Sequence, residues 1–407
     1  DLKFMGNLNN IKPALTMRLD NCNFRYSAPN GEIFYVRNMR GQLEFRDEII
    51  RLKDAYLKLN NLPLNINLET KVSDGPDIFL NLSLPKDFLQ TQNVSIENLE
   101  FNFTGNIKDT LRGNLQSKTL YRRQDTDFKM QADFKNIEFD YRNLKGRYLS
   151  AERIELVKSD PSVTQKLYFS DFNSKLSTNK DYFCIENINF NGYNGVLKGH
   201  LIVDLRKKAL LYIALNGKGL DLRPLVEDIK VIDELSDGKL DIKVIFNNHR
   251  KDFLFGTCHV KGGIADLDKL GDIVNFPSLK NTHFDTMHFY FGISKHFLKL
   301  RGIRLDSPDI ILNAYWDMNK KMSGVFNMKI SSQLLKESYQ FRKLLSLTKI
   351  REPYVDFKFL LGGIPKAKRF MWMKDEFKEK LESALSEGIK ESIEANLNKT
   401  IEELSKK

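Results

Sequence analysis

Apolar and polar residues alternate with a period of two along most of this chain. Such alternation is typical of antiparallel strands that turn one face to a dry surface and the other to water. Turn sequences separate the runs, for example DGPD at 74–77, NGYNG at 191–195 and NNHRKD at 247–252. The pattern therefore predicts a mostly β chain built from successive antiparallel hairpins, with short helices between some of them.

The apolar members of these runs are the candidate functional surface. Within one run they share a parity, so they are expected on one face of the strand. The residues selected as lining a hydrophobic groove are Leu64, Ile66, Leu80, Leu82, Leu201, Val203, Leu211, Ile213, Leu240, Ile242, Val244, Phe289, Phe291, Ile310 and Leu312. The same alternation would also suit a β-sandwich core filled by its own side chains. Large aromatic residues on the later strands favour closure toward the C-terminal end.

Three segments interrupt the strand pattern. Residues 220–238 suit a short helix after Pro224 that ends near Gly238, and residues 331–347 suit a helix with serine caps. The third segment, residues 366–407, is predicted to be one long amphipathic helix. Its apolar residues recur every four positions, at Phe377, Leu381, Leu385, Ile389, Ile393, Leu397 and Ile401.

The four-residue spacing of this tail is longer than the helical turn of about 3.6 residues, so its apolar stripe spirals around the helix. We expect the helix to wrap over a twisted surface or to kink near Gly388. The resulting domain organisation is an N-terminal repetitive amphipathic β region at 1–184, a second β region with short helices at 185–365, and the helix at 366–407.

The chain is basic, with a formal net charge of +11 over 407 residues. Residues 374–407 contain seven Lys and nine Asp or Glu, so the excess positive charge belongs to the β part. A basic surface attracts nucleic acid or acidic lipid, but it is equally the solvated face of a Lys-rich chain. The stretch LYRRQDTDFKM at 120–130 mixes basic and aromatic residues without a known nucleic-acid-binding pattern. No nucleic-acid partner is expected.

Side chains suited to catalysis are scattered. Cys22, Cys184 and Cys258 lie far apart, and His283 and His288 are five residues apart, a spacing that places strand side chains on opposite faces. No phosphate loop, nucleophile elbow or zinc-protease motif is present in the sequence. We therefore expect no enzyme activity, no metal site and no cofactor.

The second half of the chain resembles a known family in the order of its features. A strand pair, GVLKGHLIVDLRKKALLYIALNGKGLDL, leads into LRPLVEDI and then LSDGKLDIKVIF. FGTCHVKGGIADLDKLGDIV follows, then the hairpin LKLRGIRLDSPDIILNAYWDM and the closing strand YVDFKFLLGGIPKAK. This order is similar to the C-terminal region of the AsmA-like family of bacterial envelope proteins, which includes the AsmA, TamB and YhdP types. Residues 1–184 share only the style of repeated amphipathic strands.

The resemblance implies an elongated, curved, β-taco-like groove that holds phospholipid acyl chains. It further implies phospholipid transport between inner and outer membranes across the periplasm, with an anchoring helix in the inner membrane that would precede Asp1. An alternative role in the same family is that of an envelope scaffold or assembly factor for outer-membrane proteins. Such a factor would contact protein partners through a sheet edge or the C-terminal helix.

Overall fold

The structure is a computed structural model, and it describes most of the chain. The described residues are 2–5, 12–27, 33–72, 77–85, 88, 94–106, 111–123, 126–140, 147–159, 164–179, 181–207, 210–229, 235–276, 279–294, 298–319, 321–348, 352–364, 367–383 and 390–405.

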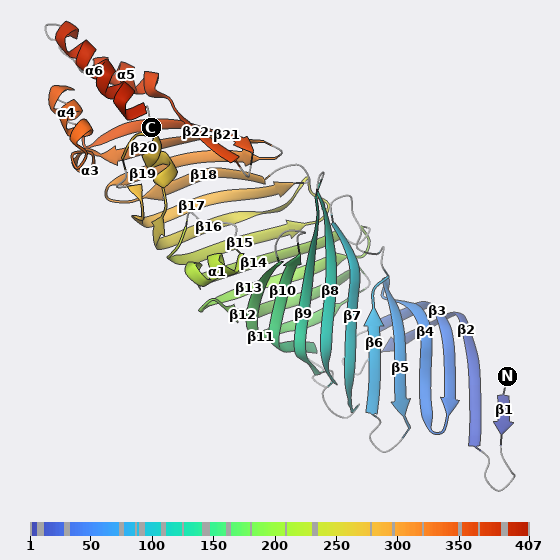
Figure 1. The fold of residues 1–407 in the computed structure, drawn as a ribbon. Helices are drawn as coiled ribbons and strands as arrows, with labels where there is room; N and C mark the ends of the chain where they lie inside the picture. Colours follow the sequence, from blue (N-terminus) through green and yellow to red (C-terminus); the bar gives the residue numbers. More distant parts are fainter. Residues whose placement is uncertain are drawn as a thin grey trace. The chain divides into compact units, whose positions relative to one another are not determined.

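The chain is mostly β, with large antiparallel sheets made of hairpins and few short helices (Figure 1). This organisation confirms the fold class expected from the alternation of apolar and polar residues. Two compact units divide the chain. Unit 1 comprises Asp1–Gly217 and Ile245–Phe253, and unit 2 comprises Lys218–Val244 and Leu254–Lys407.

Unit 1 is a meander in which each strand pairs in antiparallel fashion with the next strand of the chain. Its strands are β1 Leu2–Met5, β2 Lys12–Ser27, β3 Ile33–Arg46, β4 Ile49–Leu59, β5 Leu62–Lys71, β6 Asp77–Ser83, β7 Val94–Asn106, β8 Leu111–Arg123, β9 Thr126–Asp140, β10 Arg147–Ser159, β11 Thr164–Thr178, β12 Tyr182–Gly192 and β13 Gly195–Asp204.

Three strands carry residues of both units, namely β14 Leu210–Asp221, β15 Lys239–Asn247 and β16 Asp252–Ala265. The remaining elements belong to unit 2, in which β17 to β22 again pair in chain order. They are α1 Leu222–Ile229, α2 Asp268–Ile273, β17 Thr282–Ser294, β18 Leu298–Asp306, β19 Ile310–Met318, β20 Met322–Ser331, α3 Ser332–Leu335, α4 Tyr339–Thr348, β21 Tyr354–Ile364, β22 Ala367–Trp372, α5 Lys374–Ser383 and α6 Lys390–Ser405.

Several strands contain a bulge at an Asn or Asp residue in the left-handed conformation. Asn38 has φ 54° and Asp54 has φ 48°, and the register of each strand shifts at that point. An Asn on the neighbouring strand accepts the backbone N–H of the bulge: Asn23 Oδ1 lies 2.9 Å from Asn38 N, and Asn67 Oδ1 lies 2.8 Å from Asp54 N. Bulges bend a strand and increase its twist, so these residues distort β3 and β4 locally.

The bulges also change which residues face the apolar side. Leu52 and Ala55 are three positions apart, yet both are buried, because the bulge at Asp54 inserts an extra residue between them. The same three-residue step separates Leu300 and Ile303 of β18, where Gly302 is left-handed with φ 56°. A strict period of two therefore holds only between bulges.

Helices cover the apolar face of the sheet in unit 2. Phe357 of β21 lies at their centre, and its ring centroid is 5.7 Å from that of Phe341 of α4 and 5.1 Å from that of Phe377 of α5. Leu397 and Ile401 of α6 are also buried. The interior of unit 2 is consequently filled with its own side chains.

The predicted single helix over 366–407 is wrong at its beginning. Residues 367–372 form strand β22, which pairs with β21 and places Trp372 opposite Phe359. Phe370 and Trp372 turn toward the packed side, whereas Met371 is exposed, so a period of two operates over this short stretch. Helices α5 and α6 follow, and the expected kink at Gly388 lies outside the described residues.

The other two predicted helices are present with altered limits. Helix α1 begins at Leu222, so Pro224 lies in its first turn, where a missing backbone N–H removes no intrahelical hydrogen bond. The segment 331–347 forms two helices, α3 and α4, instead of one. The predicted serine cap is confirmed, since Ser331 Oγ accepts a hydrogen bond from Leu334 N at 3.1 Å.

Candidate functional site: the apolar face of unit 1

One face of the unit 1 sheet carries an unbroken apolar row across ten strands, β2 to β11. Each member is directly opposite the next in the strand register, so all members point to the same face. The apolar row consists of Met17, Leu43, Leu52, Leu68, Leu80, Phe103, Gly113, Ile137, Ala151 and Phe172. With adjacent strands about 4.8 Å apart, the row extends over roughly 43 Å.

Burial varies along the apolar row. Ile137, Ala151 and Phe103 are buried, whereas Leu68 and Leu80 are half-buried and Met17, near the edge of the sheet, is exposed. All six described helices belong to unit 2. Unit 1 therefore contributes no described helix of its own to this face.

Gly113 is the one member of the row that has no side chain, and its neighbours explain why. A Cβ atom at this position would lie 1.7 Å from the carbonyl oxygen of Asn102 on β7. No side chain fits at that distance, so glycine lets β7 and β8 approach each other at the point where the register of β8 with β9 shifts.

A second row runs beside the first on β4 to β7. It joins Ala55 to Ile66, Ile66 to Leu82 and Leu82 to Phe101. Leu64 lies opposite Leu57 in the same part of the sheet. Four of the residues predicted from the sequence, Leu64, Ile66, Leu80 and Leu82, thus lie together on the apolar face, and all four are half-buried.

Four further predicted residues meet in one hydrophobic cluster of unit 1. Val203 and Leu211 are buried, and Leu201 and Ile213 pack against them. Leu84 and Phe88, which follow β6, also join this cluster, together with Phe183, Leu205 and Phe246. Leu84 and Phe88 therefore cover part of the apolar surface of β13 and β14, so this part of the sheet is locally filled.

The other predicted residues belong to unit 2. Leu240 is buried, and Ile242 and Val244 beside it on β15 are half-buried, as are Phe289 and Phe291 on β17. Ile310 and Leu312 of β19 are 1% and 5% exposed, within the interior that the helices fill. The structure therefore does not bring all fifteen residues onto one open surface.

The opposite face of the unit 1 sheet is polar and carries both signs of charge. Arg51 Nε lies 2.8 Å from Glu69 Oε2, and Lys53 Nζ lies 2.8 Å from Glu44 Oε2. Glu155 pairs with Lys166 at 3.0 Å, and the hydrogen bond from Lys166 lowers the pKa of the Glu155 carboxyl. Exposed ion pairs of this kind contribute little to stability, but they keep this face in water.

Sequence reasoning missed several members of the apolar row, including Leu43, Leu52, Ile137 and Phe172, and it missed Phe88. Each bulge shifts the parity of the apolar residues within its strand, so a strict alternation of apolar and polar positions does not identify these members of the row. A usable signal was an Asn, Asp or Gly in the middle of a strand run, followed by apolar residues on the other parity, as in LKDAYL at 52–57.

Neither a metal-binding cluster nor a membrane-spanning helix is found in the part of the chain that the structure describes. Within the described ranges, no group of three or more His, Cys, Asp or Glu residues is placed to hold a metal ion. Among the described helices, none combines the length and the hydropathy needed to cross a membrane. Comparison with known protein families, with curated proteins and with solved structures finds no match for this chain.

Proposed function

We propose that unit 1 binds the acyl chains of phospholipids along its apolar face and that the protein transports phospholipid between the two membranes of a bacterial envelope. The observation that carries the proposal is the apolar row, which crosses ten strands without a polar member. The proposal agrees with the resemblance of the second half of the chain to the AsmA-like family.

The physical basis of the proposal is that every member of the row is apolar. Each buried CH₂ group of an acyl chain gains about 0.8 kcal/mol, whichever apolar neighbour it contacts. A chain that moves from Leu52 past Leu68 to Leu80 exchanges one leucine contact for another, so no position along the row holds it much more tightly than the next. Sliding along a groove requires this absence of a preferred site.

The curvature needed for a groove has a local cause in the same strands. The bulges at Asn38 and Asp54 lie on β3 and β4, next to the half-buried leucines of β5 and β6. Because bulges bend strands, we expect them to curl the sheet around its apolar face. A curled apolar face surrounds more of an acyl chain than a flat one does.

The first test is mass spectrometry of an organic extract of the purified chain, with a basic soluble protein of similar size as control. We expect near-stoichiometric phospholipid in the extract of this protein alone. An extract without lipid would contradict the proposal and favour the alternative role, that of an envelope scaffold that binds other proteins.

A pair of neighbouring residues supplies a matched test of the surface. Leu80 belongs to the apolar row, whereas Phe79 lies on the opposite face of the same strand and is 52% exposed. A carboxylate at position 80 would have to be desolvated by a bound acyl chain, so Leu80→Asp should lower the lipid content at least tenfold. Phe79→Asp should leave it unchanged.

The same two variants should differ in the transfer of a fluorescent phospholipid from donor to acceptor vesicles. Circular dichroism and thermal unfolding check that both variants remain folded. Equal lipid content and equal transfer in folded Leu80→Asp and Phe79→Asp proteins would show that the apolar row is not the binding surface.

A further inference from the structure

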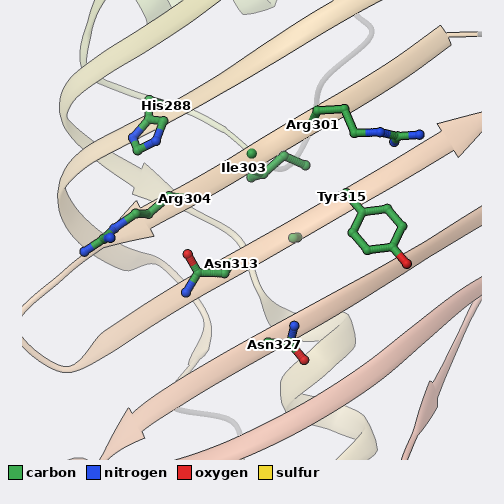
Figure 2. Close-up of a pocket in the computed structure, with 9 residues that line it drawn as sticks. His288, Arg301, Ile303, Arg304, Asn313, Tyr315 and Asn327 are labelled. Atoms are coloured by element: carbon green, nitrogen blue, oxygen red, sulfur yellow. The ribbon is translucent and has the colours of Figure 1, made fainter.

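The face of the unit 2 sheet opposite its buried strand residues carries two adjoining hollows. The larger, of about 500 Å³, is lined by the side chains of His288, Arg301, Arg304, Asn313, Tyr315 and Asn327 (Figure 2). The second, of about 310 Å³, shares Asn313 and Asn327 with the first and continues along β20 and β21 to helix α5. The two hollows therefore adjoin each other at these two asparagines.

The strand register arranges the polar lining as a row. His288 lies opposite Arg304, Arg304 opposite Asn313, Asn313 opposite Asn327 and Asn327 opposite Lys358. On β19, Asn313 alternates with the buried Leu312 and Ala314, so the polar row is on the outer face of the sheet. Five strands thus present a continuous polar surface within unit 2.

The charged members of this surface are neutralised by their neighbours. Arg301 pairs with Asp317 at 2.7 Å, Arg304 with Asp306 at 2.9 Å and Lys358 with Glu376 at 2.8 Å. An anionic ligand would have to compete with these carboxylates for the same cations. The surface is therefore better suited to a ligand that is polar but uncharged.

Three other members of the row, His288, Asn313 and Asn327, retain unused hydrogen-bonding groups. In the part of the chain that the structure describes, the side chains of His288, Asn313 and Asn327 make no hydrogen bond or ion pair with the protein. Each amide offers two N–H donors and one carbonyl acceptor. Two facing amides on adjacent strands can hold neighbouring hydroxyl groups of one ligand.

Exposed tyrosine rings border the polar row. Tyr315 is 46% exposed, and its ring lies under the guanidinium group of Arg301 at 5.4 Å. Tyr290 is 58% exposed and lies over Gly302, where a Cβ atom would be 3.3 Å from its ring. Tyrosine combines an apolar ring with a polar tip, which suits a ligand with both C–H faces and hydroxyl groups.

We propose that this outer surface of β17 to β21 is a binding site for a neutral oligosaccharide. Sugar rings supply hydroxyl groups for Asn313, Asn327 and His288, and they supply C–H faces for Tyr315 and Tyr290. Because the two hollows adjoin at the shared asparagines, the site has room for a ligand of more than one sugar unit. This site lies in unit 2 and is independent of the acyl-chain surface proposed for unit 1.

The test is saturation-transfer difference NMR on the full chain with maltohexaose, cellohexaose and chitohexaose as neutral probes and inositol hexaphosphate as the anionic probe. We expect at least one neutral hexasaccharide to bind with a Kd of about 1 mM or lower. Asn313→Ala and Tyr315→Ala should each weaken that binding about tenfold, since each removes a direct contact.

The matched control is Tyr168→Ala in unit 1. Tyr168 is also exposed, and it also has an arginine over its ring, Arg153 at 4.6 Å. This control should bind the hexasaccharide as the unaltered chain does, and thermal unfolding verifies that all three variants are folded. The proposal is overturned if no neutral hexasaccharide binds at about 5 mM, or if only inositol hexaphosphate binds. Equal binding by Asn313→Ala, Tyr315→Ala and Tyr168→Ala would overturn it as well.

Discussion

Replacement of Phe377 by alanine should destabilise unit 2 by about 4 kcal/mol. Phe377 belongs to helix α5 and is 4% exposed. Its ring is stacked on that of Phe357, with centroids 5.1 Å apart and planes at 21°, and it lies 5.3 Å from the ring of Trp372. Truncation of a buried phenylalanine to alanine costs about 3–5 kcal/mol, because apolar area is lost and a cavity remains.

The chain offers a spectroscopic probe that is specific for this unit. Its two tryptophans, Trp316 and Trp372, both lie in unit 2. Urea unfolding followed by tryptophan fluorescence therefore reports on unit 2 without a contribution from unit 1. At a slope of about 3 kcal/mol per molar urea, a loss of about 4 kcal/mol lowers the midpoint by more than about 1 M.

The matched control for this experiment is Glu379→Ala, at an exposed position of the same helix. A surface substitution of this kind should change the free energy of unfolding by less than about 0.5 kcal/mol. Phe377→Leu, which keeps an apolar side chain, should fall between the two. A loss below about 1 kcal/mol for Phe377→Ala would refute the reasoning, because helix α5 would then not contribute to the packed interior of unit 2.

Two further predictions concern a buried thiol and a bulge. Burial raises the pKa of the Cys258 thiol to about 12, so this thiol stays protonated at about pH 8. It should therefore react with a thiol-directed reagent only after unfolding. The more accessible Cys22 should react in the folded chain. Mass spectrometry after peptide digestion measures both, and rapid labelling of Cys258 in the folded chain would contradict its burial. At the bulge of β4, Asp54→Val should destabilise unit 1 by about 1–2 kcal/mol, because a β-branched side chain is disfavoured in the left-handed conformation. Asp54→Gly should be tolerated, because glycine adopts this conformation readily. Circular dichroism of urea unfolding compares the two variants, and equal midpoints would show that the left-handed backbone at position 54 is not required.

The fold class could be predicted from the sequence because alternation is a local property. In β5 and β6, Leu64 and Ile66 and likewise Leu80 and Leu82 are two positions apart, so the common face of each pair follows from strand geometry alone. The serine cap at Ser331 is also a local signal, since its hydroxyl group reaches a backbone N–H only three residues ahead. Such features need no knowledge of distant parts of the chain.

The strand that begins the predicted C-terminal helix shows where local reasoning fails. Residues 367–372 are too few for their alternation to be distinguished from the helical pattern that follows. They form a strand because they pair with β21. The limits of α3 and α4 likewise depend on the packing of Phe341 against Phe276 and Phe357. Tertiary contacts set these boundaries.

Parity within each run is enough to predict amphipathic antiparallel strands and a large apolar surface, because it fixes the face on which a side chain lies. Which of those apolar residues share a surface depends on the three-dimensional fold. The apolar row of unit 1 depends on the register between strands and on bulges such as that at Asp54, and both are set by pairing with neighbouring strands. The filling of unit 2 around Phe357 depends on helices that are distant in sequence from most of the strands they cover.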